Sequence, residues 1–154
     1  MKLEIAIALM AFSIPALAQS QGKAQVFTSA DVRGQLTQLA EQAKTKGSSG
    51  STLGDYGSHA LRLSERTVDG GAEIHAHFDD VMVVIEGKAT LITGGTVIDA
   101  HTGADGETHG ASIRDGVTQV IAAGDVVHIP AGVPHQLLIP PGTTYSALVI
   151  KVKE

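Results

Sequence analysis

The sequence predicts an all-β protein, an antiparallel sandwich or barrel with one helix ahead of it. Two observations lead to this fold class. From His59 onward, roughly seven or eight short apolar segments alternate with glycine-rich turns, which is typical of all-β sandwiches and barrels. Before these segments, residues 29–46 repeat apolar side chains at helical spacing.

The N-terminus is predicted to be a secretory signal peptide covering residues 1–18. Lys2 precedes an apolar run from Ile5 to Ile14, and the pattern Ala16-Leu17-Ala18 suits cleavage after Ala18. The run is too short to span a bilayer about 30 Å thick. The alternatives are an uncleaved anchor and a buried N-terminal strand. Cleavage would leave a periplasmic or secreted protein without membrane association.

The composition and charge of the chain limit the kinds of molecule that it is expected to bind. The chain has 154 residues, a net charge of −5 and no cysteine. It is the size of one domain, and it lacks the basic clusters that neutralise phosphates, so nucleic acid is not an expected partner. Without disulfides, stability must come from packing, oligomerisation or a metal.

One amphipathic helix is predicted over Ser29–Lys46. Ser29 and Asp31 can cap its start, and a basic stretch with a glycine, Lys44 to Gly47, is typical of a helix C-terminus. The following segment, GSSGSTLGDYGS, is nearly all turn-forming residues and is predicted to be a loop. The helix and this linker make up region 19–54, and the β-domain covers 55–154.

The predicted strands come from six apolar or alternating segments. In the first, alternation places His59 with Leu61 and Leu63, so we expect His59 to face the barrel interior as a core histidine. Asp115-Gly116 predicts a hairpin turn, and the polar stretch Asp99–Gly110 is predicted to be a lid or binding element. The six segments are HALRLSERT (59–67), VMVVIEG (81–87), ATLITGG (89–95), ASIRDGVTQVI (111–121), DVVHIP (125–130) and TYSALVIKV (144–152).

Two histidines in GGAEIHAHFDDVMVVIEG are spaced to point at one place. Residues two apart on a strand share a face, so His75 and His77 can face a common ligand. Paired neutral imidazoles suit a transition metal. The alternative for the pair alone is a polar, exposed strand end. A second segment, GDVVHIPAGVPHQLLIPPG, adds His135.

Together the two segments resemble the paired motifs of the cupin superfamily, from Gly70 to Ile139. The resemblance implies a small jelly-roll barrel, or double-stranded β-helix, holding one divalent ion. Iron, manganese, nickel, copper and zinc all suit the implied ligands. The matching positions of the first motif are Gly70 or Gly71, His75, His77, Asp80 and Gly87, those of the second are Gly124, Pro130, Gly132 and His135, and the implied ligands are His75, His77, Asp80 and His135.

The chain departs from the family pattern in three places. The family usually has a glutamate separated from the second histidine by three or four residues, whereas here the residue is the shorter aspartate and only two residues separate His77 from Asp80. Strand alternation favours Asp79 as the carboxylate, and counting back from Gly87 favours Asp80. The family's asparagine is replaced by Ile139, and the insertion Asp99–Gly110 lengthens the segment between the motifs.

Other polar residues are weaker candidates for the site. Glu107 and His109 in the insertion can act as acid or base, and Tyr145 and Tyr56 are possible proton donors. Glu73 shares the histidine face only if the strand begins that early. The side of the sheet taken by His128 is undecided. The apolar residues expected to line the pocket, if they face inward, are Met82, Val84, Leu137 and Ile139.

Two classes of function follow from this site. As an enzyme, the barrel would use the ion as a Lewis acid on a small oxygen-bearing substrate, in dioxygenase, lyase or isomerase chemistry. As a non-catalytic module, it would bind a metabolite or the metal itself. A structural protein without a site ranks third. The resemblance also implies a homodimer formed through outer sheets.

Overall fold

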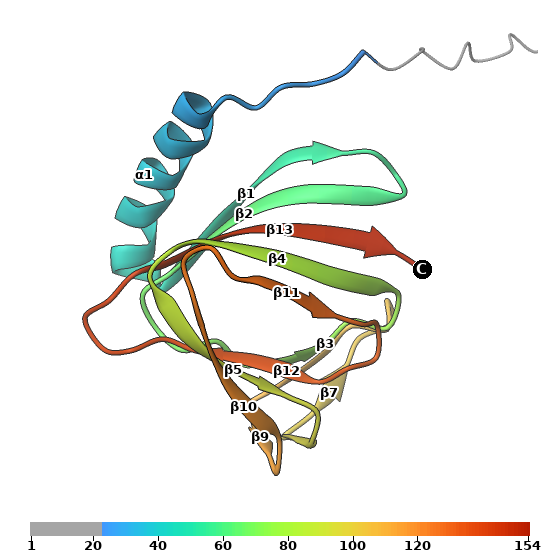
Figure 1. Cartoon of the computed structure of the whole chain (residues 1–154). Coiled ribbons are helices and arrows are strands. Elements are labelled where there is room, and N and C mark those ends of the chain that lie inside the picture. Colours follow the sequence, from blue (N-terminus) through green and yellow to red (C-terminus); the bar gives the residue numbers. More distant parts are fainter. Residues whose placement is uncertain (1–22) are drawn as a thin grey trace, which may run out of the picture.

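Residues 23–154 are described by the computed structural model, and the predicted signal peptide lies outside this range. Two curved β-sheets face each other, and one helix packs on the outside (Figure 1). The predicted all-β class with one N-terminal helix is confirmed. Among the described residues, no helix combines the length and apolar character needed to cross a membrane.

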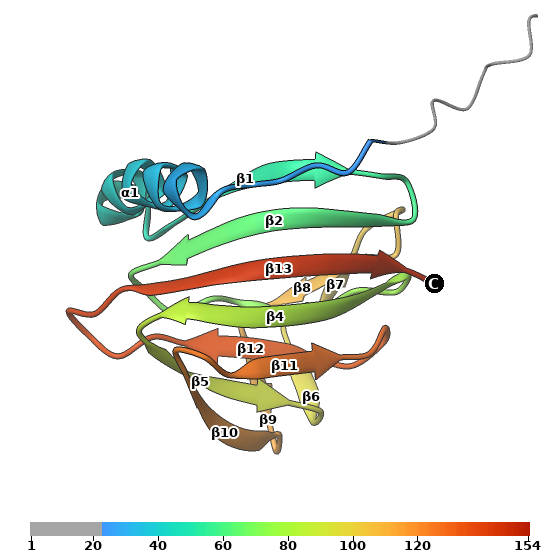
Figure 2. The same ribbon diagram turned by 45° about the horizontal axis from the view of Figure 1, so that its top comes forward.

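The first sheet has five antiparallel strands in the order β1-β2-β13-β4-β11 (Figure 2). Because β13 is the last strand and pairs between β2 and β4, the chain crosses between sheets as a jelly roll requires. The bounds are β1 Ser48–Asp55, β2 His59–Arg66, β13 Tyr145–Lys153, β4 Phe78–Glu86 and β11 Val126–Ile129.

The second sheet has six strands in the order β10-β5-β12-β3-β8-β7, and a two-stranded sheet pairs β6 with β9. The barrel core lies between the two large sheets, where Met82, Val84, Leu91 and Ala147 are buried. The bounds are β10 Val117–Ala122, β5 Lys88–Thr93, β12 His135–Leu138, β3 Ala72–Ile74, β8 Thr108–Gly110, β7 His101–Thr102, β6 Thr96–Ile98 and β9 Ser112–Arg114.

Helix α1 spans Ser29–Lys46, as the sequence predicted. Its N-cap is Thr28 rather than Ser29: the Thr28 hydroxyl accepts a hydrogen bond from the Asp31 backbone N–H at 3.2 Å, and the Asp31 carboxylate accepts from the Thr28 N–H at 3.3 Å. The helix ends at Gly47, whose φ of 81° suits glycine. Apolar side chains of α1 form a second core on the outer face of the first sheet.

The loop predicted for residues 47–58 is wrong over most of its length, because Ser48–Asp55 forms β1. Serine and glycine have low β-propensity, but here their small side chains fit under the helix. The Ser49 hydroxyl donates to the Leu39 carbonyl at 2.7 Å, and a Cβ at Gly50 would lie 2.9 Å from the Leu63 carbonyl oxygen. The barrel therefore begins at Ser48 rather than at residue 55.

The expected orientation of β2 is also wrong. Leu63 packs against Leu36 and Leu39 of α1 on the outer face, and His59 is exposed and stacks on Tyr56. The alternation was predicted correctly, but the apolar side of this strand packs against the helix core rather than the barrel interior. The polar side of β2 consequently faces inward.

The Asp115-Gly116 turn does not form the predicted hairpin. The flanking strands β9 and β10 pair with β6 and β5, respectively, and not with each other. Asp115 has a φ of 60°, and a Cβ at Gly116 would lie 2.6 Å from the Ile92 side chain. The turn therefore carries the chain between two sheets, where the same residues suit a tight change of direction.

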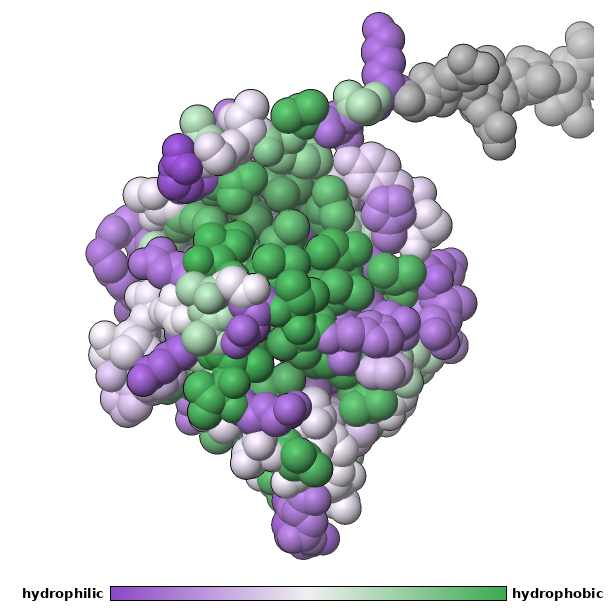
Figure 3. All heavy atoms as spheres, in the orientation of Figure 1, coloured by the Kyte–Doolittle hydropathy of each residue, from purple (hydrophilic) through white to green (hydrophobic). Residues whose placement is uncertain are grey.

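Apolar side chains also cover the outer face of the first sheet beyond the helix. Cross-strand pairing places Val126 and Val83 in one row, which continues from Leu148 at the α1 core, and it places Val81 and Ile150 in the next row. Figure 3 shows apolar side chains gathered over β13, β4 and β11. This apolar outer face is the part of the first sheet that α1 leaves uncovered.

Candidate metal centre

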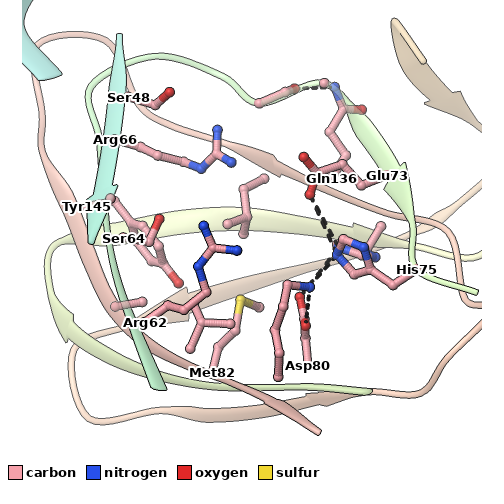
Figure 4. Close-up of a pocket in the computed structure, with 18 of the residues that line it drawn as sticks. Ser48, Arg62, Ser64, Arg66, Glu73, His75, Asp80, Met82, Gln136 and Tyr145 are labelled. Atoms are coloured by element: carbon pink, nitrogen blue, oxygen red, sulfur yellow. Dashed lines mark hydrogen bonds and ion pairs between the residues drawn. The ribbon is translucent and has the colours of Figure 1, made fainter. Parts of the chain in front are cut away.

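A cavity of about 450 Å³ lies inside the barrel. Its lining comes from β1, β2, β4 and β13 of the first sheet and from β3, β8 and β12 of the second. Histidines and carboxylates lie at one end, and arginines and hydroxyls at the other (Figure 4). This volume suits a small metabolite.

Short strands and a tight turn bring the histidines together. His135 begins β12 and stands opposite Glu73 of β3, so the two side chains are cross-strand neighbours. His75 follows directly after β3, and its carbonyl accepts a hydrogen bond from the Gly132 N–H at 2.8 Å. Asp80 reaches the same place from β4.

Four donor atoms converge at this end of the cavity. The ligand atoms of Glu73, His75 and His135 all lie within 4.8 Å of one another. The Asp80 carboxylate is 3.3 Å from His75 Nε2 and 4.0 Å from His135 Nε2. Both histidines and Asp80 are buried, which excludes most competing water.

The Nδ1 atoms of His75 and His135 each have a hydrogen-bond partner. His75 Nδ1 is hydrogen-bonded to the Glu107 carboxylate, and His135 Nδ1 lies 3.1 Å from the Val133 carbonyl oxygen. In the neutral imidazole, an acceptor at Nδ1 favours the proton on that atom, so Nε2 would keep the lone pair that a metal takes. This is the second-sphere arrangement that orients metal-binding histidines. The donor set therefore fits a divalent transition metal.

The pKa values favour the protonation states that a metal needs at two of the positions. Burial lowers the pKa of His135, which favours the neutral imidazole. Burial opposes ionisation of Asp80, but hydrogen bonds from His75 and Lys151 outweigh it and lower its pKa. Burial also lowers the pKa of His75, but bonds to Asp80 and Glu107 outweigh it and raise the pKa above 6.5. A bound cation would favour loss of that proton.

The structure does not bring His77 to the cluster. His77 is exposed, and a Cβ at Gly106 would lie 3.2 Å from its Nε2. Strand β3 ends at Ile74, so residues 75–77 bend and the two-residue alternation stops at His75. Among the described residues, Glu73 lies in the cluster where the resemblance implied His77.

The two adjacent aspartates lie on opposite faces of β4, and Asp80, which the count from Gly87 favoured, is the one that lines the cavity. Asp80 faces the cavity, where Lys151 Nζ lies 2.7 Å from its Oδ1. Asp79 faces outward, accepting a hydrogen bond from the Ala131 N–H at 2.8 Å and lying 3.1 Å from His128 Nε2. His128 therefore lies on the outer face of the first sheet.

The three candidate acid or base residues take different positions. Glu107 touches His75, because β7 and β8 of the insertion form a hairpin that pairs with β3. His109 is largely exposed, with its Nδ1 3.9 Å from Glu73. Tyr145 is fully buried beside the cavity, and burial raises its pKa to about 12, so the phenol keeps its proton.

The predicted apolar lining is present only in part. Met82 and Leu137 line the cavity, whereas Val84 and Ile139 are buried in the core around it. The sequence did not predict that polar residues of β2 form a wall of the cavity. The signal was available in the alternation of Arg62, Ser64 and Arg66, but that face was expected to be the outer one.

Comparison of the sequence with protein families and with curated proteins gives no match. Solved structures do match. A cupin-2 domain from Rhodospirillum rubrum has a TM-score of 0.51 and 17% identity over 70% of this chain and 61% of that one. The polyketide cyclase RemF from Streptomyces resistomycificus has a TM-score of 0.51 and 20% identity, over 71% and 67%. The DMSP lyase DddQ from Ruegeria pomeroyi has a TM-score of 0.52 and 15% identity, over 71% and 49%.

These matches establish the architecture. At 15–20% identity the likeness concerns the fold alone, and the chain spans about half to two thirds of the length of these proteins. The chain has the cupin fold, the jelly-roll barrel that its two sequence motifs predicted.

Proposed function

We propose that this cupin holds one divalent transition metal through Glu73, His75 and His135, with Asp80 as a further donor, and binds a small oxygen-bearing metabolite beside it. The observation that carries the proposal is the convergence of the donor atoms within 4.8 Å, with both histidines oriented by partners at Nδ1. Two imidazoles and carboxylates suit iron, manganese, nickel, copper or zinc.

A metal bound here would supply Lewis-acid polarisation of a substrate oxygen. The chain's own residues would do the rest. Glu107 holds His75 in one tautomer, Lys151 fixes Asp80, and the barrel walls limit access of water. Dioxygenase, lyase and isomerase reactions are all compatible with this chemistry. Among proteins of this fold are a polyketide cyclase and a DMSP lyase, so the fold itself does not select the reaction.

A second candidate is a binding module without turnover. The observation that favours it is that each carboxylate lining the cavity already has a partner: Asp80 contacts Lys151, Glu107 contacts His75, and Glu73 lies near both buried histidines. An enzyme needs an acid or base with a free proton position. Turnover assays on metal-loaded protein separate the two candidates.

The first experiment is elemental analysis of mature protein purified without added metal or chelator. We expect about one equivalent of a transition metal, and its loss in a His75→Ala, His135→Ala double variant. Glu73→Ala should also lower the metal content, whereas His77→Ala, the matched control two residues beyond the cluster, should retain it. Folded wild-type protein that takes up no metal on reconstitution would rule out the metal proposal.

We also infer that the protein is exported, on the strength of the predicted signal peptide. Mature protein recovered from the periplasm or the medium should begin at Gln19. Intact-mass measurement of secreted protein tests this directly, and a mass that includes residues 1–18 would contradict it.

A further inference from the structure

Strand β2 places two arginines at the cavity, of which Arg66 is half-buried and Arg62 is exposed. Arg62, Ser64 and Arg66 alternate with the outward-facing leucines, and they pair across to Val149, Ala147 and Tyr145 of β13. Both arginines line the same cavity as the histidine cluster, at the end away from it (Figure 4). Gly70 leaves room for one of them, because a Cβ there would lie 2.9 Å from Arg66 Nη1.

Neither guanidinium has a carboxylate partner. Within residues 23–154, no aspartate or glutamate lies within 4.0 Å of either arginine's side-chain nitrogens. The acidic groups of the cavity are engaged instead with histidines and Lys151. An arginine pair in a partly enclosed cavity favours a bound anion, because the guanidinium fork matches planar oxyanions with two hydrogen bonds.

A buried hydroxyl is also without a partner at this end. Tyr145 is fully buried, its phenol oxygen makes no hydrogen bond to any described residue, and it stands opposite Arg66 in the sheet. Buried hydroxyls are normally satisfied. A ligand oxygen held by Arg66 would supply the missing partner.

The charges lining the cavity also favour a bound anion. Arg62, Arg66 and Lys151 oppose Glu73, Asp80 and Glu107, so the formal charges balance before any metal binds. A divalent ion would leave an excess of two positive charges. A small anion with more than one carboxylate compensates that excess.

We propose that Arg62 and Arg66 bind a carboxylate of a small organic acid, whose other oxygen-bearing end faces the histidine cluster. The metal end of this assignment rests on the proposed function. Carboxylate is favoured over phosphate because phosphate sites commonly use helix N-termini or nests of backbone N–H groups. Helix α1, the one helix among residues 23–154, does not line the cavity.

Calorimetric titration with malonate, succinate and malate tests this assignment, on both metal-loaded and EDTA-treated protein. Malamide, the uncharged diamide of malate, and inorganic phosphate are titrated alongside. We expect at least one dicarboxylate to bind, and its dissociation constant to rise about tenfold or more in Arg62→Gln and in Arg66→Gln. Arg114→Gln removes the same charge from a largely exposed position outside the cavity, and it should bind as wild type does.

Thermal melts and metal content accompany every variant, so unfolding is recognised independently of binding. The assignment is overturned if none of the three dicarboxylates binds at millimolar concentration, if malamide binds as well as malate, or if phosphate binds more tightly with the same arginine dependence. Arginine-dependent binding in protein that takes up no metal on reconstitution would support the carboxylate site and refute the metal proposal. Metal uptake together with dicarboxylate binding that is unchanged in both arginine variants would support the metal proposal and refute the carboxylate site.

Discussion

At the residue scale, Glu107 tests whether the second sphere of the histidine cluster matters. Its carboxylate contacts His75 Nδ1 from the insertion, although it is no neighbour of the cluster in sequence. Glu107→Gln keeps the size of the side chain but removes the charge that favours a proton on Nδ1. We expect metal affinity to fall about 10- to 100-fold, as measured by zinc competition titration. Glu41→Gln, an exposed change on α1, serves as the control, and equal affinity in the two variants would contradict this role for Glu107.

A second buried carboxylate lies on the other side of the first sheet. Glu65 is 1% exposed, and its Oε2 has no hydrogen-bond partner among the described residues. Burial raises its pKa above 4.5, Ser146 partly offsets this by a hydrogen bond, and the charge of Glu86 raises the pKa further. The folded state therefore prefers protonated Glu65.

Stability should consequently depend on the ionisation of Glu65. Its contribution is fully present below the unfolded pKa, near 4.5, and is lost as pH rises through the higher folded pKa. Glu65→Gln mimics the protonated form, so the stability difference between wild type and variant should grow in favour of the variant over that window. Urea denaturation of both proteins at increasing pH measures the difference. A difference that stays constant with pH would show that Glu65 does not titrate abnormally.

At the scale of elements, the sequence predicts what local chemistry determines. The bounds of α1 followed from its apolar spacing and terminal residues, and most strands from apolar alternation. Strand β1 was missed because its serines and glycines form a strand only beneath a helix. The orientation of β2 was predicted wrongly. Alternation separates the apolar face of a strand from its polar face, but it does not tell whether the apolar face packs in the barrel interior or against the helix.

In the candidate site, too, the sequence predicted the residues that local motifs identify and missed those that depend on how the strands pair. His75 and His135 were found because their motifs fix them in sequence, and counting from Gly87 selected the cavity-facing Asp80 over Asp79. Glu73 was considered but not chosen, because its place depends on where β3 begins and ends. The contact between Glu107 and His75 is set by the pairing of β8 with β3, which no local pattern specifies.

Gly87 tests how tightly the chain must turn between the two sheets. It connects β4 to β5 with a φ of 77°, and a Cβ there would lie 2.0 Å from the Thr144 carbonyl oxygen. Gly142 has a similar φ of 74° but open space around it. Alanine at Gly142 should cost only the backbone penalty, about 1–2 kcal/mol, whereas alanine at Gly87 should cost clearly more because backbone must shift.

Urea denaturation of Gly87→Ala and Gly142→Ala compares the two penalties. The paired design separates crowding from backbone conformation, since both glycines have positive φ. Equal loss of stability in the two variants would mean that the approach of Thr144 to Gly87 relaxes at no cost.

At the scale of the whole molecule, no helix or strand among residues 23–154 packs over the apolar outer face of the first sheet. Val126 is 67% exposed and Ile85 is 38% exposed, beside the rows formed by Val83, Val81 and Ile150. Contiguous apolar area of this kind is typical of an interface. Because the chain has no disulfide to stabilise a small barrel, we expect a second copy to cover this face, giving a homodimer with two-fold symmetry.

Sedimentation of the mature protein at micromolar concentration tests the dimer. An Ile85→Lys, Val126→Lys double variant should sediment as a monomer, because two buried lysines without partners oppose association. The control places lysines at Val117 and Val120 of β10, which are 67% and 72% exposed but lie in the second sheet, and it should remain dimeric. A monomeric wild type would refute the dimer. A dimeric Ile85→Lys, Val126→Lys variant would show that the dimer interface lies on another surface. Metal content measured on the monomeric variant then decides whether the site is complete within one chain, as the distances among Glu73, His75 and His135 indicate.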